Sequence, residues 1–299
     1  MKIIGVRLDD GSVHVARLAG PGSAELLAPL ERFWADPQAH LAPEATATAV
    51  VLLDDVEQVP PVLPGAKVLC IGLNYLKHVE EGSYSADGVP PFPTLFARWT
   101  SSLSVDGATV PVPANEPGVD WEGEIVAYVG RTLVDAGPDE ALDAVVGYSV
   151  FNDLTSRTAQ KLTSQWILGK NGDRSGPLGP LVPASEVGDL RDGLRVTTRV
   201  NGETVQDGRT DQMVYTVGET LSLVSRTMTL RPGDLLATGT PSGVGYSRTP
   251  PWLLTPGDVV EVDVERLGVL RTPVVGNEAR HAHGHAHDDV PATSAEATR

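Results

Sequence analysis

The sequence predicts a mainly β protein of the α+β class. Segments rich in β-branched residues and bounded by Gly or Pro recur along the chain, whereas few segments have helical periodicity. With 299 residues, of which 41% are hydrophobic, the chain can bury the core that such sheets need. The strands expected in the main body are Lys67–Ile71, Glu124–Val129, Leu194–Val200, Leu235–Thr238 and Val259–Val264.

The first sixty residues are expected to form a small N-terminal α/β domain, residues 1–62. Residues 59–64 contain three prolines, which can continue neither a helix nor a central strand, so we place the domain boundary there. The main body would then be residues 63–276. The elements expected before the boundary are strands at Lys2–Arg7 and Val13–Leu18 around a turn at residues 9–12, a short helix, and a strand at Ala49–Leu53.

Turn and helix signals punctuate the main body. Asn201-Gly202 between two strand segments predicts a two-residue hairpin. The motif Leu-x-Pro-Gly-Asp occurs at residues 230–234 and 254–258, and its Pro-Gly pairs suit type II turns. Helices are predicted to begin near Asp139 and to span Thr216–Ser225.

Residues 277–299 form a polar stretch that is rich in small residues, and we expect a disordered tail. Histidine occupies every second position from 281 to 287. Such a run can capture transition metals, but a flexible tail is the favoured interpretation.

Charge and cysteine content exclude several classes of protein. The formal net charge of −16 and the pI near 4.7 disfavour nucleic acid and anionic membranes as partners. We find neither a signal peptide nor an apolar run long enough to span a membrane, so a cytoplasmic protein is expected. The single cysteine, Cys70, lies in a predicted strand, which excludes intrachain disulfides and a thiolate metal site.

Three carboxylates indicate a metal site. Glu122 and Glu124 stand at i and i+2 on a strand, so both side chains point to the same face, and Asp153 ends an apolar segment. Three hard oxygen ligands suit Mg²⁺ or Mn²⁺, with Ca²⁺ as an alternative. A solvated strand face would explain the glutamate pair equally well.

Three further clusters carry polar residues. His78 and Glu81 would share one face of a helix, where the carboxylate can orient the imidazole, although a surface contact is the simpler explanation. Lys170 follows an aromatic residue and a glycine, and by itself it is only a surface lysine. The glycine-rich stretch 237–245 can hold a carboxylate or phosphate through backbone N–H groups, but it matches neither a Walker A loop nor the dinucleotide fingerprint.

In the identity of their residues and their order along the chain, these clusters together resemble the fumarylacetoacetate hydrolase family, from about Lys67 to Val275. The resemblance implies a β-sandwich roll behind a small N-terminal domain, and homodimers. The motifs that carry it are Gly72-Leu73-Asn74-Tyr75-x-x-His78-x-x-Glu81, Glu122-x-Glu124, Asn152-Asp153 with Arg157 and Gln160, Trp166 to Lys170, Pro177 to Pro180, Asn201-Gly202-Glu203 with Gln206, and Gly239 to Gly245.

The resemblance also implies a role for each matching residue. Glu122, Glu124 and Asp153 would hold Mg²⁺ or Mn²⁺, with Lys170 nearby as a catalytic residue. His78 and Glu81 would form a water-activating dyad on a short lid helix. Substrate would be bound by Tyr75, Arg157, Gln160 and Thr240. The chain departs from the family pattern at Arg98, Thr158 and Gly172, which puts the shape of the substrate pocket in doubt.

The function that follows is a metal-dependent hydrolase that cleaves a C–C bond in a β-dicarbonyl or 2-oxo acid, such as an acylpyruvate or a fumarylacetoacetate-like compound from aromatic catabolism. The alternatives are an isomerase of the 2-hydroxyhepta-2,4-diene-1,7-dioate type and an oxaloacetate-type decarboxylase, both of which use an enolate stabilised by the metal. The intact His78–Glu81 pair favours the hydrolase. A catalytically silent binding module is disfavoured because Lys170 is also present.

Overall fold

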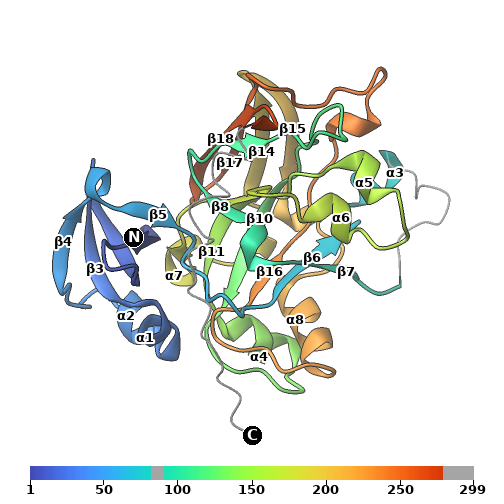
Figure 1. Cartoon of the computed structure of the whole chain (residues 1–299). Helices are drawn as coiled ribbons and strands as arrows, with labels where there is room; N and C mark the ends of the chain where they lie inside the picture. The colour runs from blue at the N-terminus through green and yellow to red at the C-terminus, as the bar shows by residue number, and fades with distance from the viewer. Residues whose placement is uncertain (82–90, 279–299) are drawn as a thin grey trace, which may run out of the picture.

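A computed structural model describes residues 1–81 and 91–278 of the chain and shows three β-sheets with short helices around them (Figure 1). The predicted tail lies outside the described residues from position 279 onward, as does most of the segment after the predicted lid helix. Within the described part, no helix is long and apolar enough to cross a membrane.

The N-terminal elements form a five-stranded antiparallel sheet of their own, in the order β4-β3-β2-β1-β5 (Figure 1). The predicted first hairpin is confirmed, but a third strand follows it before the first helix. The elements are β1 (Ile3–Arg7), β2 (Val13–Gly20), β3 (Ser23–Pro29), α1 (Leu30–Ala35), α2 (Pro37–Leu41), β4 (Ala49–Leu52), the 3-10 helix η1 (Leu53–Asp55) and β5 (Glu57–Val59).

The N-terminal sheet shares a hydrophobic core with the main body. Trp34 of α1 stacks on Tyr128 with ring centroids 5.9 Å apart, and its indole N–H donates to the carbonyl of Pro61 at 2.9 Å. Ile3 and Leu181 exchange two backbone hydrogen bonds, each 2.8 Å long. Residues 1–62 remain our proposed domain, and they pack firmly against the body.

The central sheet has the order β7-β6-β16-β10-β11-β12-β8, and β13 also pairs with β11. Its middle strands β10 and β11 are buried along their whole length, as expected for a sheet that is covered on both faces. Its strands are β6 (Val68–Gly72), β7 (Thr94–Arg98), β8 (Leu103–Val105), β10 (Gly123–Val129), β11 (Val145–Asn152), β12 (Gly176–Leu178), β13 (Val182–Pro183) and β16 (Leu235–Ala237).

A third sheet, in the order β15-β14-β17-β18-β9, packs through Val196 and Val262 on Ile125 and Ala127 of β10. The predicted hairpin is confirmed, because Asn201 and Gly202 both have positive φ and join two of its strands. The strands are β9 (Val110–Pro111), β14 (Arg195–Val200), β15 (Glu203–Arg209), β17 (Val259–Val264) and β18 (Gly268–Val275).

The helices of the body are short. Both predicted ones are confirmed, as α4 and α8, and Thr216 caps the second by accepting a hydrogen bond from the N–H of Glu219. The α-helices are α3 (Leu76–Glu81), α4 (Pro138–Asp143), α5 (Arg157–Gln160), α6 (Ile167–Lys170), α7 (Ala184–Val187) and α8 (Val217–Ser225), and the 3-10 helices are η2 (Thr100–Ser102), η3 (Leu190–Asp192), η4 (Thr210–Gln212) and η5 (Gly245–Ser247).

Both predicted Pro-Gly turns are also present. Gly233 and Gly257 have φ values of 89° and 101°, and the N–H of the following aspartate closes each turn. The fold brings the start of β10 and the C-terminal ends of β6, β11 and β16 to the same end of the central sheet, where polar side chains gather.

Candidate metal centre and active site

Two neighbouring strands bring three carboxylates together. Glu122 and Glu124 flank the first residue of β10, and Asp153 follows the last residue of β11. Antiparallel pairing sets Gly123 opposite Asn152, and the N–H of Asp153 donates to the carbonyl of Glu122 at 2.9 Å. One oxygen of each carboxylate lies within 4.8 Å of the others, and all three side chains are buried. This trio can hold a metal ion.

Cations contact two of the three carboxylates. The Nζ of Lys170 lies 2.5 Å from Oε2 of Glu122 and 2.5 Å from Oδ2 of Asp153. Arg157 Nη2 lies 2.7 Å from Oε1 of Glu122. Glu124 accepts a hydrogen bond from the N–H of Gly239 at 2.9 Å and, among the described residues, forms no ion pair.

Burial therefore acts differently on the two glutamates. Burial, together with the charges of Asp153 and Glu122, raises the pKa of Glu124 well above its usual range. Burial also raises the pKa of Glu122, but Lys170 and Arg157 outweigh it and bring that pKa to about 2. A divalent cation would remove the repulsion at Glu124, and three oxygen donors without sulfur or nitrogen fit a hard ion.

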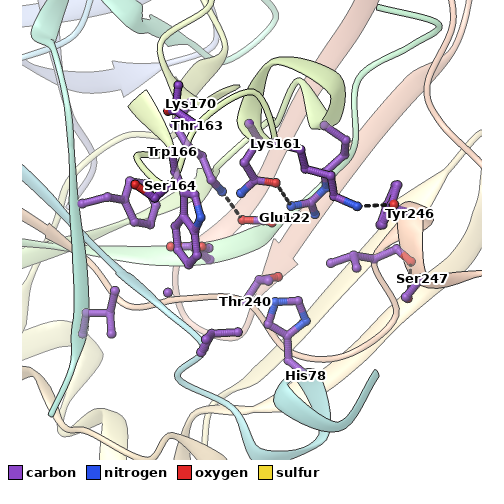
Figure 2. A pocket seen from close by; sticks show the side chains of 18 residues that line it. His78, Glu122, Lys161, Thr163, Ser164, Trp166, Lys170, Thr240, Tyr246 and Ser247 are labelled. Carbon is purple, nitrogen blue, oxygen red and sulfur yellow. Dashed lines mark hydrogen bonds and ion pairs between the residues drawn. The ribbon is translucent and has the colours of Figure 1, made fainter. Parts of the chain in front are cut away.

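His78 and Glu81 lie on α3 and face one another. Nδ1 of His78 is 2.8 Å from Oε1 of Glu81, and both carboxylate oxygens of Glu81 accept a hydrogen bond from the N–H of Gly243, at 3.0 and 2.9 Å. Because Nδ1 then serves as the donor to Glu81, Nε2 is left as an acceptor. Figure 2 shows the ring of His78 below Thr240 and Glu122, turned toward the cavity.

One cavity of about 420 Å³ joins these groups (Figure 2). The predicted site residues among its lining are His78, Glu122, Glu124, Arg157, Gln160, Lys170 and Thr240, and the others are Ile71, Gly72, Leu73, Phe96, Lys161, Thr163, Ser164, Trp166, Val244, Tyr246 and Ser247. Three predicted site residues do not line the cavity, namely Glu81, Asp153 and Tyr75. Glu81 and Asp153 contact residues that do, whereas Tyr75 is buried, and burial and the charge of Glu124 raise the pKa of its hydroxyl. Its contact with substrate stays a prediction.

Comparison with known proteins identifies the family of the chain. A family model described as "Fumarylacetoacetate (FAA) hydrolase C-terminal" matches residues 67–275. The chain belongs to the fumarylacetoacetate hydrolase family. An oxaloacetate tautomerase of Xenopus laevis, fahd2, mitochondrial, is 36% identical over 223 residues, which cover 74% of this chain and 69% of the relative.

Solved structures of this family share the fold. A 2-hydroxyhepta-2,4-diene-1,7-dioate isomerase from Mycobacterium marinum matches with a TM-score of 0.74 and 30% identity, over 93% of this chain and 99% of the other. A fumarylpyruvate hydrolase from Pseudomonas aeruginosa, solved with Mn²⁺ and pyruvate, matches with a TM-score of 0.64 and 33% identity, over 74% and 92% of the two chains. The predicted family and fold are confirmed.

The glycine-rich segment 239–246 of this family member binds the protein's own carboxylates. Besides Glu124 and Glu81, it holds Asp120, whose oxygens accept from the N–H groups of Gly245 and Tyr246 at 2.7 and 3.1 Å. Asp120 in turn lies 2.6 Å from the guanidinium of Arg157. The sequence predicts an anion-binding turn, and the anions that it binds in the structure are the side chains of Glu81, Glu124 and Asp120.

Thr240 and Gln206 brace the start of β10. The hydroxyl of Thr240 donates to the carbonyl of Gly123 at 3.0 Å and accepts from Nε2 of Gln206 at 2.8 Å. Oε1 of Gln206 accepts from the N–H of Gly123 at 3.0 Å. The N–H and the carbonyl of Gly123 are thereby both hydrogen-bonded, which fixes the direction of the Glu122 and Glu124 side chains on either side of it.

Arg98 is a site residue whose role sequence reasoning missed. Its side chain, at the end of β7, is fully buried. Its Nε donates to Asp153, and its other nitrogens donate to Leu154 O at 2.8 Å and Ser175 Oγ at 2.9 Å. The fork of the guanidinium thereby fixes the orientation of Asp153. The signal was an arginine at the end of an apolar strand, where a charge needs a partner.

Replacing Gly243 with alanine is expected to loosen the His78–Glu81 pair. Gly243 has a φ of 106°, and a Cβ there would lie 2.3 Å from the carbonyl oxygen of Val205, so the segment must shift and release Glu81. We expect kcat to fall roughly tenfold or more, on the scale of a weakened general base. Hydrogen exchange of the α3 amides should accelerate in the same variant.

The matched control is Gly257→Ala. Gly257 has a φ of 101° with nothing within 4 Å of the added Cβ, so the backbone strain is similar but the site is untouched. Equal effects of the two substitutions on kcat would show that strain alone is responsible and that Gly243 does not position Glu81.

Proposed function

We propose that the chain is a Mg²⁺- or Mn²⁺-dependent hydrolase that cleaves a C–C bond in a β-dicarbonyl 2-oxo acid of the acylpyruvate type. The observation that carries the proposal is that one cavity is lined by His78, which is paired with Glu81, and by two carboxylates of the buried trio, Glu122 and Glu124. The relative solved with Mn²⁺ and pyruvate supports both the ion and the 2-oxo acid.

Glu122, Glu124 and Asp153 would hold the ion, because they provide three oxygen donors and neither sulfur nor imidazole. When bound, the ion supplies Lewis acidity that stabilises negative charge on substrate oxygens. Ca²⁺ is the alternative ion.

His78 would act as the general base. Its Nε2 takes a proton from water, and the carboxylate of Glu81, 2.8 Å from Nδ1, stabilises the imidazolium that forms. The resulting hydroxide adds to the carbonyl remote from the carboxylate, and the C–C bond then breaks. The electron pair leaves as the enolate of the smaller 2-oxo acid, which takes up the proton from His78.

Lys170 would stabilise the negative charge that develops on a substrate oxygen. Burial lowers the pKa of Lys170, but the adjacent charges of Asp153 and Glu122 outweigh it, so the pKa is raised and the ammonium group stays charged. Its fixed position between two carboxylates means that little reorganisation is needed during reaction. Arg157, Gln160 and Thr240 would orient the substrate oxygens from other walls of the cavity.

A second candidate is tautomerisation or isomerisation of a 2-oxo dicarboxylic acid. The names of the Xenopus laevis relative and of the Mycobacterium marinum structure favour it. His78 would then move a proton between carbon and oxygen without attack by water. A screen of acylpyruvates, oxaloacetate and hydroxydienedioates with Mg²⁺ or Mn²⁺, followed by mass spectrometry and ultraviolet absorbance, separates cleavage from isomerisation.

We further propose that the chain acts as a homodimer.

Removal of divalent ions is expected to abolish turnover. Without the ion, the three carboxylates no longer present the Lewis acid that would stabilise negative charge on substrate oxygens. Addition of Mg²⁺ or Mn²⁺ to the chelated protein should restore the rate, which a continuous assay on the substrate found in the screen would measure. Full activity after exhaustive treatment with EDTA would exclude the metal.

A further inference from the structure

Three cationic side chains line the cavity, and their partners differ. Lys170 and Arg157 each contact two carboxylates. Lys161, directly after α5, donates from Nζ to the hydroxyl of Tyr246, and this nitrogen lies 3.7 Å from the centroid of the tyrosine ring. Within the described parts of the chain, Lys161 forms no ion pair. Its charge is therefore available to an anionic ligand.

The position of Lys161 suits the far end of an elongated ligand. Figure 2 shows Lys161 and Tyr246 on one side of the cavity, Lys170 and Trp166 on the other, and Glu122 between them. The wall at Trp166 is aromatic, because Phe96 packs edge-on against it with ring centroids 5.5 Å apart. If one end of a ligand lies at Glu122 and Glu124, a second, anionic group at its other end would therefore meet a cation on the Lys161 side of the cavity.

The partner of Lys161 is held in place. The N–H of Tyr246 donates to the buried carboxylate of Asp120 at 3.1 Å, and the neighbouring hydroxyl of Ser247 donates to the carbonyl of Val244 at 2.9 Å. Contact with the tyrosine ring restrains the long lysine side chain and keeps its ammonium group at the cavity. Binding of an anion there therefore costs less side-chain conformational entropy than binding at a lysine that moves freely on the surface.

We propose that Lys161 binds the distal carboxylate of a dicarboxylic 2-oxo acid and so makes the enzyme selective for dicarboxylates. This inference rests on the proposed 2-oxo acid function. It adds a specificity residue outside the metal ligands and the His78–Glu81 pair. A charge-assisted hydrogen bond from an exposed lysine corresponds to a preference of about tenfold over a ligand without the second carboxylate.

The test is the affinity of the full chain, loaded with Mg²⁺, for two five-carbon 2-oxo acids, measured by isothermal titration calorimetry. 2-Oxoglutarate carries a distal carboxylate and 2-oxopentanoate does not. We expect Lys161→Met to weaken 2-oxoglutarate about tenfold and to leave 2-oxopentanoate within twofold, which also shows that the site is intact. Lys2→Met, the same charge change at a residue that does not line the cavity, should alter neither affinity.

Each other outcome counts against a defined claim. If Lys161→Met leaves both affinities unchanged, or weakens both acids equally, the distal-carboxylate role is wrong and the 2-oxo acid function stands. If the wild-type protein with Mg²⁺ binds neither acid, the proposed function fails, and the subsite fails with it.

Discussion

The Glu124→Gln variant is expected to lose metal affinity while its metal-free form gains stability. Glutamine keeps the hydrogen bond from Gly239 but removes a charge that burial and two neighbouring carboxylates disfavour. Loss of outer-shell partners already weakens metal binding about 10–100-fold, so loss of a ligand charge should exceed that. Relief of the repulsion should raise the Tm of the metal-free protein by about 2–4 °C.

Stability should also respond to pH in a defined direction. Because the pKa of Glu124 is higher in the folded protein than in the unfolded chain, the metal-free native state binds more protons. Its free energy of unfolding therefore falls as pH rises above about 4.3, until the folded-state pKa is passed. Glu124→Gln should flatten this dependence, whereas Glu140→Gln, an exposed change of equal charge on α4, should not.

Metal titration and differential scanning calorimetry of the chelated protein measure both effects. If Glu124→Gln binds Mg²⁺ or Mn²⁺ as tightly as the wild type, Glu124 is not a ligand. A lower Tm in the metal-free variant would show that the carboxylate is stabilised by a contact other than the ion.

The second large effect is expected for His78→Ala. If His78 delivers and accepts the proton, kcat should fall by roughly 10²–10⁴, the usual scale of general acid–base catalysis, with metal affinity close to that of the wild type. Glu81→Gln keeps the shape of the side chain but removes the charge that supports the imidazolium, so it should reproduce much of the loss. His40→Ala, in the N-terminal sheet region, is the control.

The same variant separates the two candidate reactions. Exchange of the acidic C–H of substrate with D₂O, followed by NMR, reports enolate formation independently of cleavage. In a hydrolase, His78→Ala should keep exchange and lose cleavage, whereas in a tautomerase exchange and tautomerisation should fall together. Cleavage of a confirmed substrate at the wild-type rate by His78→Ala would rule out His78 as the base that activates water.

Local rules were sufficient to predict part of the site. Glu122 and Glu124 share a face because strand side chains alternate, and this required only the assignment of β10. The pair His78–Glu81 likewise follows from helical spacing. Asp153 needed more, because its place beside the glutamates depends on the pairing of β10 with β11, which the family resemblance supplied.

The missed residues depend on contacts between distant segments. Arg98 meets Asp153 only because β7 lies at the edge of the same sheet, and Asp120 meets residue 246 across 126 positions of sequence. No periodicity encodes such contacts. Strand β3 was also missed, since its run of Ala, Glu and Leu is typical of a helix and pairing with β2 overrides that propensity.

The shared core of the N-terminal sheet and the body has a consequence for synthesis. Trp34 and Ile3 leave the ribosome early, but Tyr128 and Leu181, on which they pack or pair, are added much later. At roughly 5–20 residues per second, the interval between Trp34 and Tyr128 lasts on the order of ten seconds. Until Tyr128 is added, the nascent chain therefore exposes an aromatic surface that its own later residues must cover.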